Sequence, residues 1–434
     1  MRQKSLWVIA IGGCTVLLAA AYISPDHLGF NSLLSAQAYR RGVALDEKHD
    51  LANAISEYSL AIARDPNMAE AFNARAVARR RTGDFDGAVA DLNEVIRLRP
   101  NDSAGYFNRA VTYQLAWNDD AALRDFDESI TRASAFLKEL ERQRGAKLDY
   151  VRRTIEIEAR ARLIDARLAH GKLAAQSGDH SRALKDFEEA AASTNTLGRT
   201  SGKLEHARVR VLQRDYETAK SEIEGFLAAE PDNAGGLMLR GFMLLFHDRL
   251  PGAAAEDFEK ALNLGFKYQE TRGMMAAADP GLFGTSSWLA YGVLFRPDIY
   301  YLVAWQHVAR RRSGQETELD LDANLRRLAT ALGGADMLTG AVSAKKLRES
   351  LVEWPGPVLQ VFSGQMSEEQ LLSAAGNAPN EIVRQRRVCD ARFYGALYKP
   401  LSPPDLHAAM QDTVRACPQG ALEAVAAELE HDAP

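Results

Sequence analysis

The sequence predicts an all-α protein in which helical hairpins stack into a solenoid, with a less regular helical cap towards the C-terminal end. Two observations support this fold class. Small and apolar residues recur every 34 residues through the first part of the chain, and amphipathic segments separated by Gly, Pro and Ser follow it. The 434 residues are 46% hydrophobic and 26% charged, with a net charge of -5. This composition excludes a disordered chain and lacks the basic footprint of a nucleic-acid-binding protein.

The first segment, residues 1–24, has the features of a membrane address. Arg2 and Lys4 precede an uncharged apolar run at 6–23. As a helix this run reaches roughly 27 Å, enough to cross the core of a bilayer. Basic residues before such a run predict a cytoplasmic N-terminus and export of the remainder. Residues 25–34 are expected to form a linker.

Three fates of the apolar run remain open. It is either a signal peptide cleaved after Ala19-Ala20-Ala21 or an uncleaved anchor to the cytoplasmic membrane. The third alternative is lipidation of Cys14 in the sequence Ile11-Gly12-Gly13-Cys14. Each alternative predicts a periplasmic protein, either soluble or attached to the membrane.

A unit of 34 residues organises the chain from residue 35 onwards. Ala54, Ala88 and Ala122 occupy one repeated position, and a bulky residue follows each of them four positions later. The small residues let two helices cross closely, and a proline near the end of the unit stops the second helix. These features resemble the tetratricopeptide repeat, a helix–turn–helix unit of this period. The resemblance implies six units, namely 35–68, 69–102, 103–136, 164–197, 200–233 and 234–268.

Units 1–3 thus span 35–136 and units 4–6 span 164–268, and a charged helical extension is expected at 137–163. Position 7 of each unit is basic or titratable, and position 23 is acidic. The pairs are Arg41 with Glu57, Arg75 with Asp91, Arg109 with Asp125, His170 with Asp186, His206 with Glu222, and Arg240 with Asp257. We predict a partly buried ion pair or hydrogen bond inside each unit, bidentate where arginine is present. The alternative is a row of ligand-binding arginines.

The first helix of each unit is expected to line a concave face through positions 2, 5, 9 and 12. In units 1–3 the predicted partner-binding groove comprises Tyr39, Val43, Asp46, Asn73, Val77, Arg80, Phe107, Val111 and Gln114. Aromatic side chains among polar neighbours suit a peptide or a partner helix. The alternative is that the three valines only pack the repeats together.

The last third of the chain is predicted to continue as helices that lose the strict period. A looser connector is expected at 269–298, followed by a helical region resembling the repeats at 299–434. The expected helices lie at 299–312, 316–332, 342–351, 357–363, 367–375, 381–398, 404–416 and 419–430. Loss of period is typical of a solenoid end that must be capped.

Cys389 and Cys417 lie in a predicted helical hairpin at 381–416 and its immediate flank. Antiparallel helices of these lengths bring the start of the first helix close to the end of the second. Because an exported chain meets an oxidising compartment, we predict a disulfide between these cysteines. Two free buried thiols are the alternative.

The stretch from Trp354 to Leu371, together with Phe393-Tyr394-Gly395 and Glu428-Leu429, resembles the NlpI-type tetratricopeptide lipoproteins of bacterial envelopes. This chain has more repeats than that family usually shows. The resemblance implies an envelope adaptor that holds peptidoglycan hydrolases or a processing protease. Within the stretch, Ser367 and Gln370 have the spacing of a capping box at a helix start.

No catalytic, cofactor or metal motif is found in the sequence. It contains neither HExxH, nor GxSxG, nor paired CxxC, and the glycine-rich Gly198–Lys203 is one residue short of a phosphate loop. The first functional hypothesis is a non-enzymatic scaffold that binds a protein or peptide and no nucleic acid. The alternatives are an enzyme with an unrecognised site in 270–355 and a self-assembling structural module, such as a homodimer.

Overall fold

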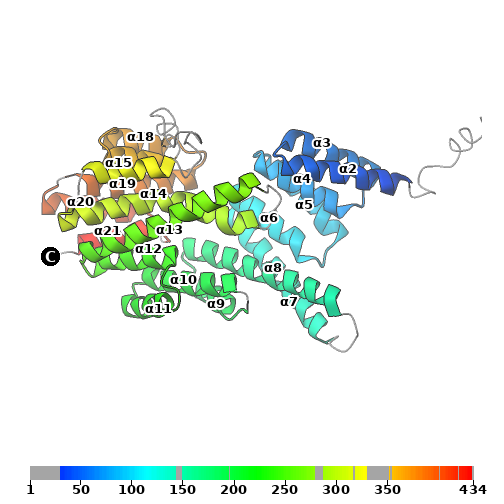
Figure 1. Ribbon diagram of the computed structural model, residues 1–434, viewed down its shortest axis with the longest axis horizontal. Coiled ribbons are helices and arrows are strands. Elements are labelled where there is room, and N and C mark those ends of the chain that lie inside the picture. The colour runs from blue at the N-terminus through cyan, green and yellow to red at the C-terminus, as the bar shows by residue number, and fades with distance from the viewer. Residues whose placement is uncertain are drawn as a thin grey trace, which may run out of the picture. The chain divides into compact units, whose positions relative to one another are not determined.

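The computed structural model describes residues 30–142, 149–194, 196–278, 287–315, 318–329, 351, 354–399, 401–418 and 420–432. All regular elements of these residues are helices, so the predicted all-α fold is confirmed (Figure 1). The chain divides into two compact units, Met1–Arg132 and Ala133–Pro434. The apolar run at 6–23 and Cys14 lie outside the described residues. Within the described part, no helix has both the length and the apolar character needed to span a bilayer.

The N-terminal unit consists of successive helices, each packed against the next one in sequence (blue to cyan in Figure 1). They are α2 (Phe30–Glu47), α3 (Leu51–Arg64), α4 (Ala69–Arg81), α5 (Phe85–Leu98), α6 (Ser103–Leu115) and the first part of α7 (Asp119–Arg142). The repeated small and bulky positions form the core, since Ala54, Tyr58, Ala88, Leu92, Ala122 and Phe126 are all buried. The helix pairs α2–α3, α4–α5 and α6–α7 correspond to the predicted units 1–3.

The turn between the two helices of a unit has one repeated conformation. One residue of the turn has a positive φ, and in units 1–4 the Asp or Asn that follows it caps the second helix. Gly83 has φ of 84°, and the Asp84 carboxylate then accepts from the backbone N–H of Gly87. Four units place a residue other than glycine here, and these are His49, Trp117, Arg214 and Arg249. Sequence gave no signal for the positive φ at these four residues.

In the second unit the predicted repeats 4–6 appear as three further helix pairs. Their helices are α8 (Asp149–Gln176), α9 (His180–Ala191), α10 (Thr196–Leu212), α11 (Tyr216–Ala229), α12 (Ala234–Phe242) and α13 (Pro251–Ala278). Unit 6, at 234–268, has one residue more than the others. The structure accommodates it in a π-helical segment, η2 (Met243–His247), because a π-helical turn holds more residues than an α-helical turn.

The C-terminal region is helical at nearly every position that the sequence predicted. Its described helices are α14 (Ser287–Ser313), α15 (Glu318–Ala329), α17 (Gly356–Phe362), α18 (Glu368–Gly376), α19 (Glu381–Tyr398), α20 (Pro403–Ala416) and α21 (Leu422–His431). Ser367 and Gln370 form the predicted capping box of α18. The helix expected at 342–351 lies almost entirely outside the described residues.

The connector predicted at 269–298 is largely helical instead. Helix α13 continues to Ala278 and α14 begins at Ser287, so helices occupy most of this range. Pro297, near the expected end of the connector, lies inside α14. A proline there removes the backbone hydrogen bond that its missing N–H would donate, and a long helix retains its other bonds.

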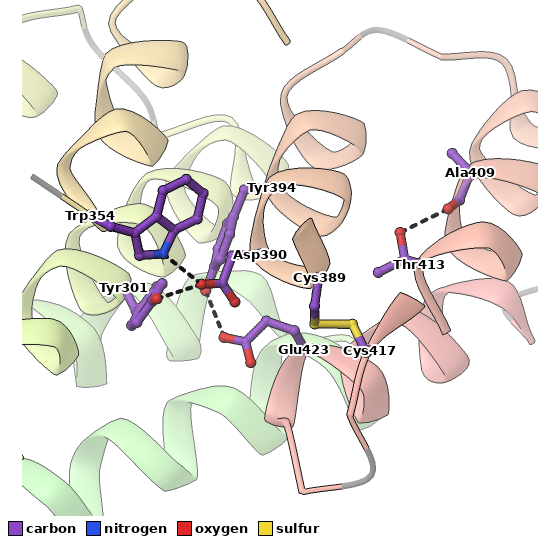
Figure 2. Close-up of a disulfide and its surroundings, with 9 residues drawn as sticks. All are labelled: Tyr301, Trp354, Cys389, Asp390, Tyr394, Ala409, Thr413, Cys417 and Glu423. Carbon is purple, nitrogen blue, oxygen red and sulfur yellow. Dashed lines mark hydrogen bonds between the residues drawn. A yellow bond between two sulfur atoms is a disulfide. The ribbon is translucent and has the colours of Figure 1, made fainter. Parts of the chain in front are cut away.

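Helices α19 and α20 pack against each other, and Cys389 and Cys417 are joined by a disulfide at their open end (Figure 2). The bridge closes a loop with a sequence separation of 28, and Cys389 is buried. A cross-link of this length limits the conformations of the unfolded chain. In the folded protein the same bond holds the end of α20 against α19, shortly before α21 begins.

We expect the double substitution Cys389→Ala and Cys417→Ala to lower the free energy of unfolding by about 3–4 kcal/mol, because the unfolded chain regains the entropy of the open loop. Urea unfolding of the oxidised protein, followed by circular dichroism, measures this loss. Reduced wild-type protein is the control and should unfold at the same urea concentration as the variant. Equal midpoints for oxidised wild type and variant would contradict the prediction.

Candidate functional site

The basic residue at position 7 contacts the acid at position 23 in all six units. Three arginines make two hydrogen bonds each to a carboxylate, at 2.6 and 2.9 Å for Arg75, 2.6 and 2.8 Å for Arg109, and 2.7 Å twice for Arg240. Their partner carboxylates are buried. The hydrogen bonds that Arg109 and Arg240 donate to Asp125 and Asp257 raise the pKa of these arginines.

Two histidines replace arginine in units 4 and 5. His170 Nδ1 lies 2.5 Å from Asp186, and His206 Nδ1 lies 2.9 Å from Glu222. Unit 1 differs, because Arg41 makes a single 2.8 Å contact with Glu57 and half of its side chain is exposed. The partial burial predicted for every pair is therefore wrong for Arg41.

The arginines of units 2 and 3 also bind the preceding unit. Arg75 Nη1 donates to Ser59 Oγ at 2.9 Å, and Arg109 Nη1 donates to Asn93 Oδ1 at 2.7 Å. Ser59 and Asn93 both occupy position 25 of their units. The polar residue at position 25 is the sequence signal for this contact between neighbouring units, and we did not predict it. With these donors engaged inside the fold, the structure favours the structural interpretation over a row of ligand-binding arginines.

The predicted groove residues lie on the first helices of units 1–3. Tyr39 packs against Tyr58 and Phe107 against Phe126, with ring centroids 5.8 and 5.9 Å apart. Val111 is buried, so it contributes to packing within the repeat. The other apolar members, Tyr39, Val43, Val77 and Phe107, are partly exposed.

Three polar members of the groove form contacts with neighbouring side chains or backbone. Asp46 pairs with Arg81, and Asn73 Oδ1 accepts a hydrogen bond from Asn108 Nδ2 at 2.7 Å. Arg80 Nη1 reaches the carbonyl of Asn108 at 3.4 Å. The structure thus brings Asn73 and Arg80 together beside α6, while Gln114 lies half-buried one unit further on.

In the C-terminal compact unit, Ala133–Pro434, the chain's own C-terminal helices cover the first helices of repeat units 4–6. Helix α21 packs on α10 and on η2, and α19 is joined to them by rings, with Phe246 and Phe393 5.8 Å apart. Position 12, which is Asp46, Arg80 or Gln114 in units 1–3, is here Ala175, Val211 or Leu245, and these three are buried. In units 1–3 the residues at position 12 are all partly exposed.

Helix α21 is acidic and is held by arginines. Arg214 Nε donates to Glu428 at 2.8 Å, while Arg249 and Arg312 bind Glu430 at 2.6 and 2.7 Å. Arg214 and Arg249 are the positive-φ turn residues of units 5 and 6, so the turns direct these side chains towards the helix. These contacts join residues far apart in sequence, and no local pattern predicts them.

Two buried carboxyl groups lie close to the disulfide, between α14, α19 and α21 (Figure 2). Asp390 accepts hydrogen bonds from Tyr301 Oη at 2.6 Å and Trp354 Nε1 at 3.0 Å, and Tyr394 Oη bonds Glu423 at 3.2 Å. Burial, reinforced by the charge of Glu423, raises the pKa of Asp390 to about 8. Burial also raises the pKa of Glu423. Asp390 is therefore mostly protonated at neutral pH.

The described residues do not assemble a metal site. No group of three or more His, Cys, Asp or Glu side chains within them could hold a metal ion. The Asp390–Glu423 cluster is enclosed by aromatic rings, including Tyr301 stacked on Tyr394 at 5.7 Å. Much of the range 270–355, where the sequence left room for an enzyme site, lies outside the described residues.

The comparisons with known proteins agree with this architecture. The family model described as tetratricopeptide repeat matches residues 39–103 and 204–267. These two stretches are therefore similar to tetratricopeptide repeats, and they lie in an all-α fold of stacked helical hairpins. No curated protein matches the sequence. The narrower resemblance to NlpI-type lipoproteins stays a prediction.

Several solved structures are similar in fold. A tetratricopeptide repeat protein from Parabacteroides merdae is 21% identical, with a TM-score of 0.36, and the match covers 57% of this chain and 84% of that one. Pseudomonas aeruginosa pilF is 18% identical, with a TM-score of 0.37 and coverage of 58% and 94%. YrrB, a tetratricopeptide protein with an unusual peptide-binding site, is 14% identical, with a TM-score of 0.34 and coverage of 48% and 91%. The family match, rather than these structures, identifies the repeats.

We expect Asp125→Ala to lower the free energy of unfolding by about 3 kcal/mol, because Arg109 is left partly buried without its counter-ion. Glu57→Ala is the matched control, because Arg41 is half exposed and water can replace its partner. The control should change the melting temperature little. Thermal unfolding followed by circular dichroism measures both variants, and equal losses would show that burial does not determine the strength of these pairs.

The raised pKa of Asp390 has a consequence for stability. The folded protein keeps a proton that the unfolded chain releases above its usual pKa of 3.8. The stabilisation is therefore complete below about pH 4 and is lost as the pH rises towards 8. Asp390→Asn preserves an oxygen acceptor without the charge, so wild type should lose stability relative to this variant between pH 5 and pH 8.

Urea midpoints of wild type and Asp390→Asn at pH 5 and pH 8 test this expectation. Asp412→Asn is the control, because that carboxylate is exposed and pairs only with Arg415 three residues on. A difference between wild type and Asp390→Asn that stays constant with pH would mean that Asp390 is ionised at both values.

Proposed function

We propose that the protein is a non-enzymatic scaffold that binds a protein partner through the first helices of units 1–3. One observation carries this proposal. Helix α21 packs on the equivalent face of units 5 and 6, where position 12 is the apolar Val211 or Leu245, whereas Asp46, Arg80 and Gln114 keep position 12 polar in units 1–3. The chain therefore contains an example of a helix bound to this face.

The exposed composition of the face suits a protein ligand. Tyr39 and Phe107 are half-buried aromatic side chains on the first helices of units 1 and 3, and Val77 lies on the intervening helix. Aromatic residues are enriched where protein interfaces concentrate their binding energy. The polar residues Asn73, Arg80 and Gln114 would give such an interface its specificity.

We also propose that the scaffold acts in the periplasm of a bacterial envelope, either free or attached to the cytoplasmic membrane. The basic and apolar residues at the N-terminus support export, and the disulfide between Cys389 and Cys417 is typical of an oxidising compartment. The resemblance around Trp354–Leu371 to NlpI-type lipoproteins suggests peptidoglycan hydrolases or a processing protease as partners.

Crosslinking in membranes, followed by affinity capture and mass spectrometry, tests the binding face. The variant Val77→Lys with Gln114→Lys places two charges in the groove without removing a buried contact pair. Leu60→Lys, on an exposed position of the second helix of unit 1, is the control. We expect the groove variant to recover at least tenfold less crosslinked partner, and the control to recover the wild-type amount.

Undiminished recovery by a folded groove variant would refute binding at this face. Circular dichroism establishes that both variants are folded. Hydrolysis of peptidoglycan or peptide by the purified protein alone would instead favour an enzyme.

A further inference from the structure

Three consecutive arginines end α4, and their environments differ. Arg79 pairs with Asp84 at 3.4 Å and with Asp91 at 2.9 Å. Arg81 pairs with Asp46 on the neighbouring unit. Arg80 has no carboxylate within ion-pair distance among the described residues, and its guanidinium makes one long hydrogen bond, to the Asn108 carbonyl at 3.4 Å.

The side chain of Arg80 is nevertheless withdrawn from water. It is partly buried on the face predicted to bind a partner. Loss of hydration, together with the neighbouring charge of Arg81, lowers the pKa of Arg80 to about 10. A desolvated cation without a counter-ion destabilises a fold, and most such groups are paired. The free protein thus carries a cost at Arg80 that an incoming anion would remove.

The C-terminal compact unit, Ala133–Pro434, shows what kind of group meets an arginine beside its first helices. Helix α21 presents an apolar side, with Leu422 and Val425 buried, and acidic residues beside it. Glu428 and Glu430 bind arginines of units 5 and 6. The charge of Arg208, at position 9 of unit 5, also acts on Glu423 of the same helix, opposing the rise in its pKa.

We infer that the groove of units 1–3 binds an amphipathic α-helix of another protein, and that an Asp or Glu on the apolar side of this helix pairs with Arg80. This inference rests on the proposed function and assigns Arg80 as the residue that determines specificity. Apolar residues of the helix contact the partly exposed side chains around Val77, and the carboxylate neutralises the guanidinium. The charge at Arg80 selects acidic helices and rejects otherwise similar neutral ones.

A selection from a displayed library of helical peptides tests the inference with the full chain. The library holds 15-residue peptides of Ala, Leu, Glu, Gln and Lys, and selected peptides are measured by fluorescence anisotropy. We expect the selected helices to share an acidic residue within their apolar side. Arg80→Met, which keeps the aliphatic stem, should weaken their binding at least tenfold. Arg97→Met is the control, since Arg97 is exposed on α5 and pairs with Glu94.

Replacing the shared Glu of a selected peptide by Gln should cause the same loss with wild-type protein and no further loss with Arg80→Met. The free Arg80→Met protein should also melt about 2–4 °C higher than wild type, because the unpaired cation is gone. Arg79→Met should melt lower, because it leaves Asp91 with one partner fewer.

The outcomes separate the inference from the proposed function. Selected helices without a shared acid, or binding that Arg80→Met leaves unchanged while Val77→Lys with Gln114→Lys abolishes it, would overturn the role of Arg80 and keep the groove. Binding that neither variant affects would overturn both. Selected sequences that match α21, together with concentration-dependent dimerisation of the chain, would identify a second copy as the occupant and overturn the assignment to another protein.

Discussion

The pairing of a basic residue with a carboxylate inside each helical hairpin is the constraint on which the repeats depend. A small residue next to the base lets the two helices approach closely, and at Gly241 an added Cβ would lie 2.5 Å from the Phe258 ring. At such a separation the carboxylate is largely withdrawn from water, so it is tolerated only with a partner. The guanidinium of Arg240 does this, and it fixes the rotation of one helix against the other.

Histidine in units 4 and 5 takes the place of arginine opposite the carboxylate. The planar fork of arginine has donors to spare, and in units 2 and 3 the spare donor reaches the preceding hairpin at Ser59 or Asn93. His170 and His206 each contact their carboxylate through Nδ1. Arg75 and Arg109 thus also join neighbouring hairpins through polar contacts.

The helices and their pairing could be predicted because the relevant residues are local and repeated. A small residue recurs at the position of Ala54 and a bulky residue at the position of Tyr58 in every unit. This repetition excludes chance as the origin of the pattern. Features that occur once, or that depend on distant residues, could not be predicted. The extra residue of unit 6 was visible as a length, but its position in η2 depends on how that helix packs.

The candidate site shows the same division. The groove positions could be predicted from the repeat. In contrast, Arg79, Arg80 and Arg81 are the same amino acid and differ only in the residues that surround them. Successive residues of a helix point about 100° apart, so one of them faces Asp91, one faces Asp46 and one faces neither. Which arginine lacks a counter-ion is a property of the packed hairpins and cannot be read from the run of three.

The first helices of units 4–6, which the chain itself covers, differ in polarity from those of units 1–3, for which we propose a partner. A face that stays covered can be entirely apolar, as it is at Val211 and Leu245 beneath the C-terminal helices, because it never meets water after folding. A face that exchanges between water and a partner must be compatible with both, so it keeps polar groups that hydrate when free and pair when bound. Arg80 is withdrawn from water in the free protein and gains a counter-ion only when an anion binds. Such a residue favours reversible binding of a partner.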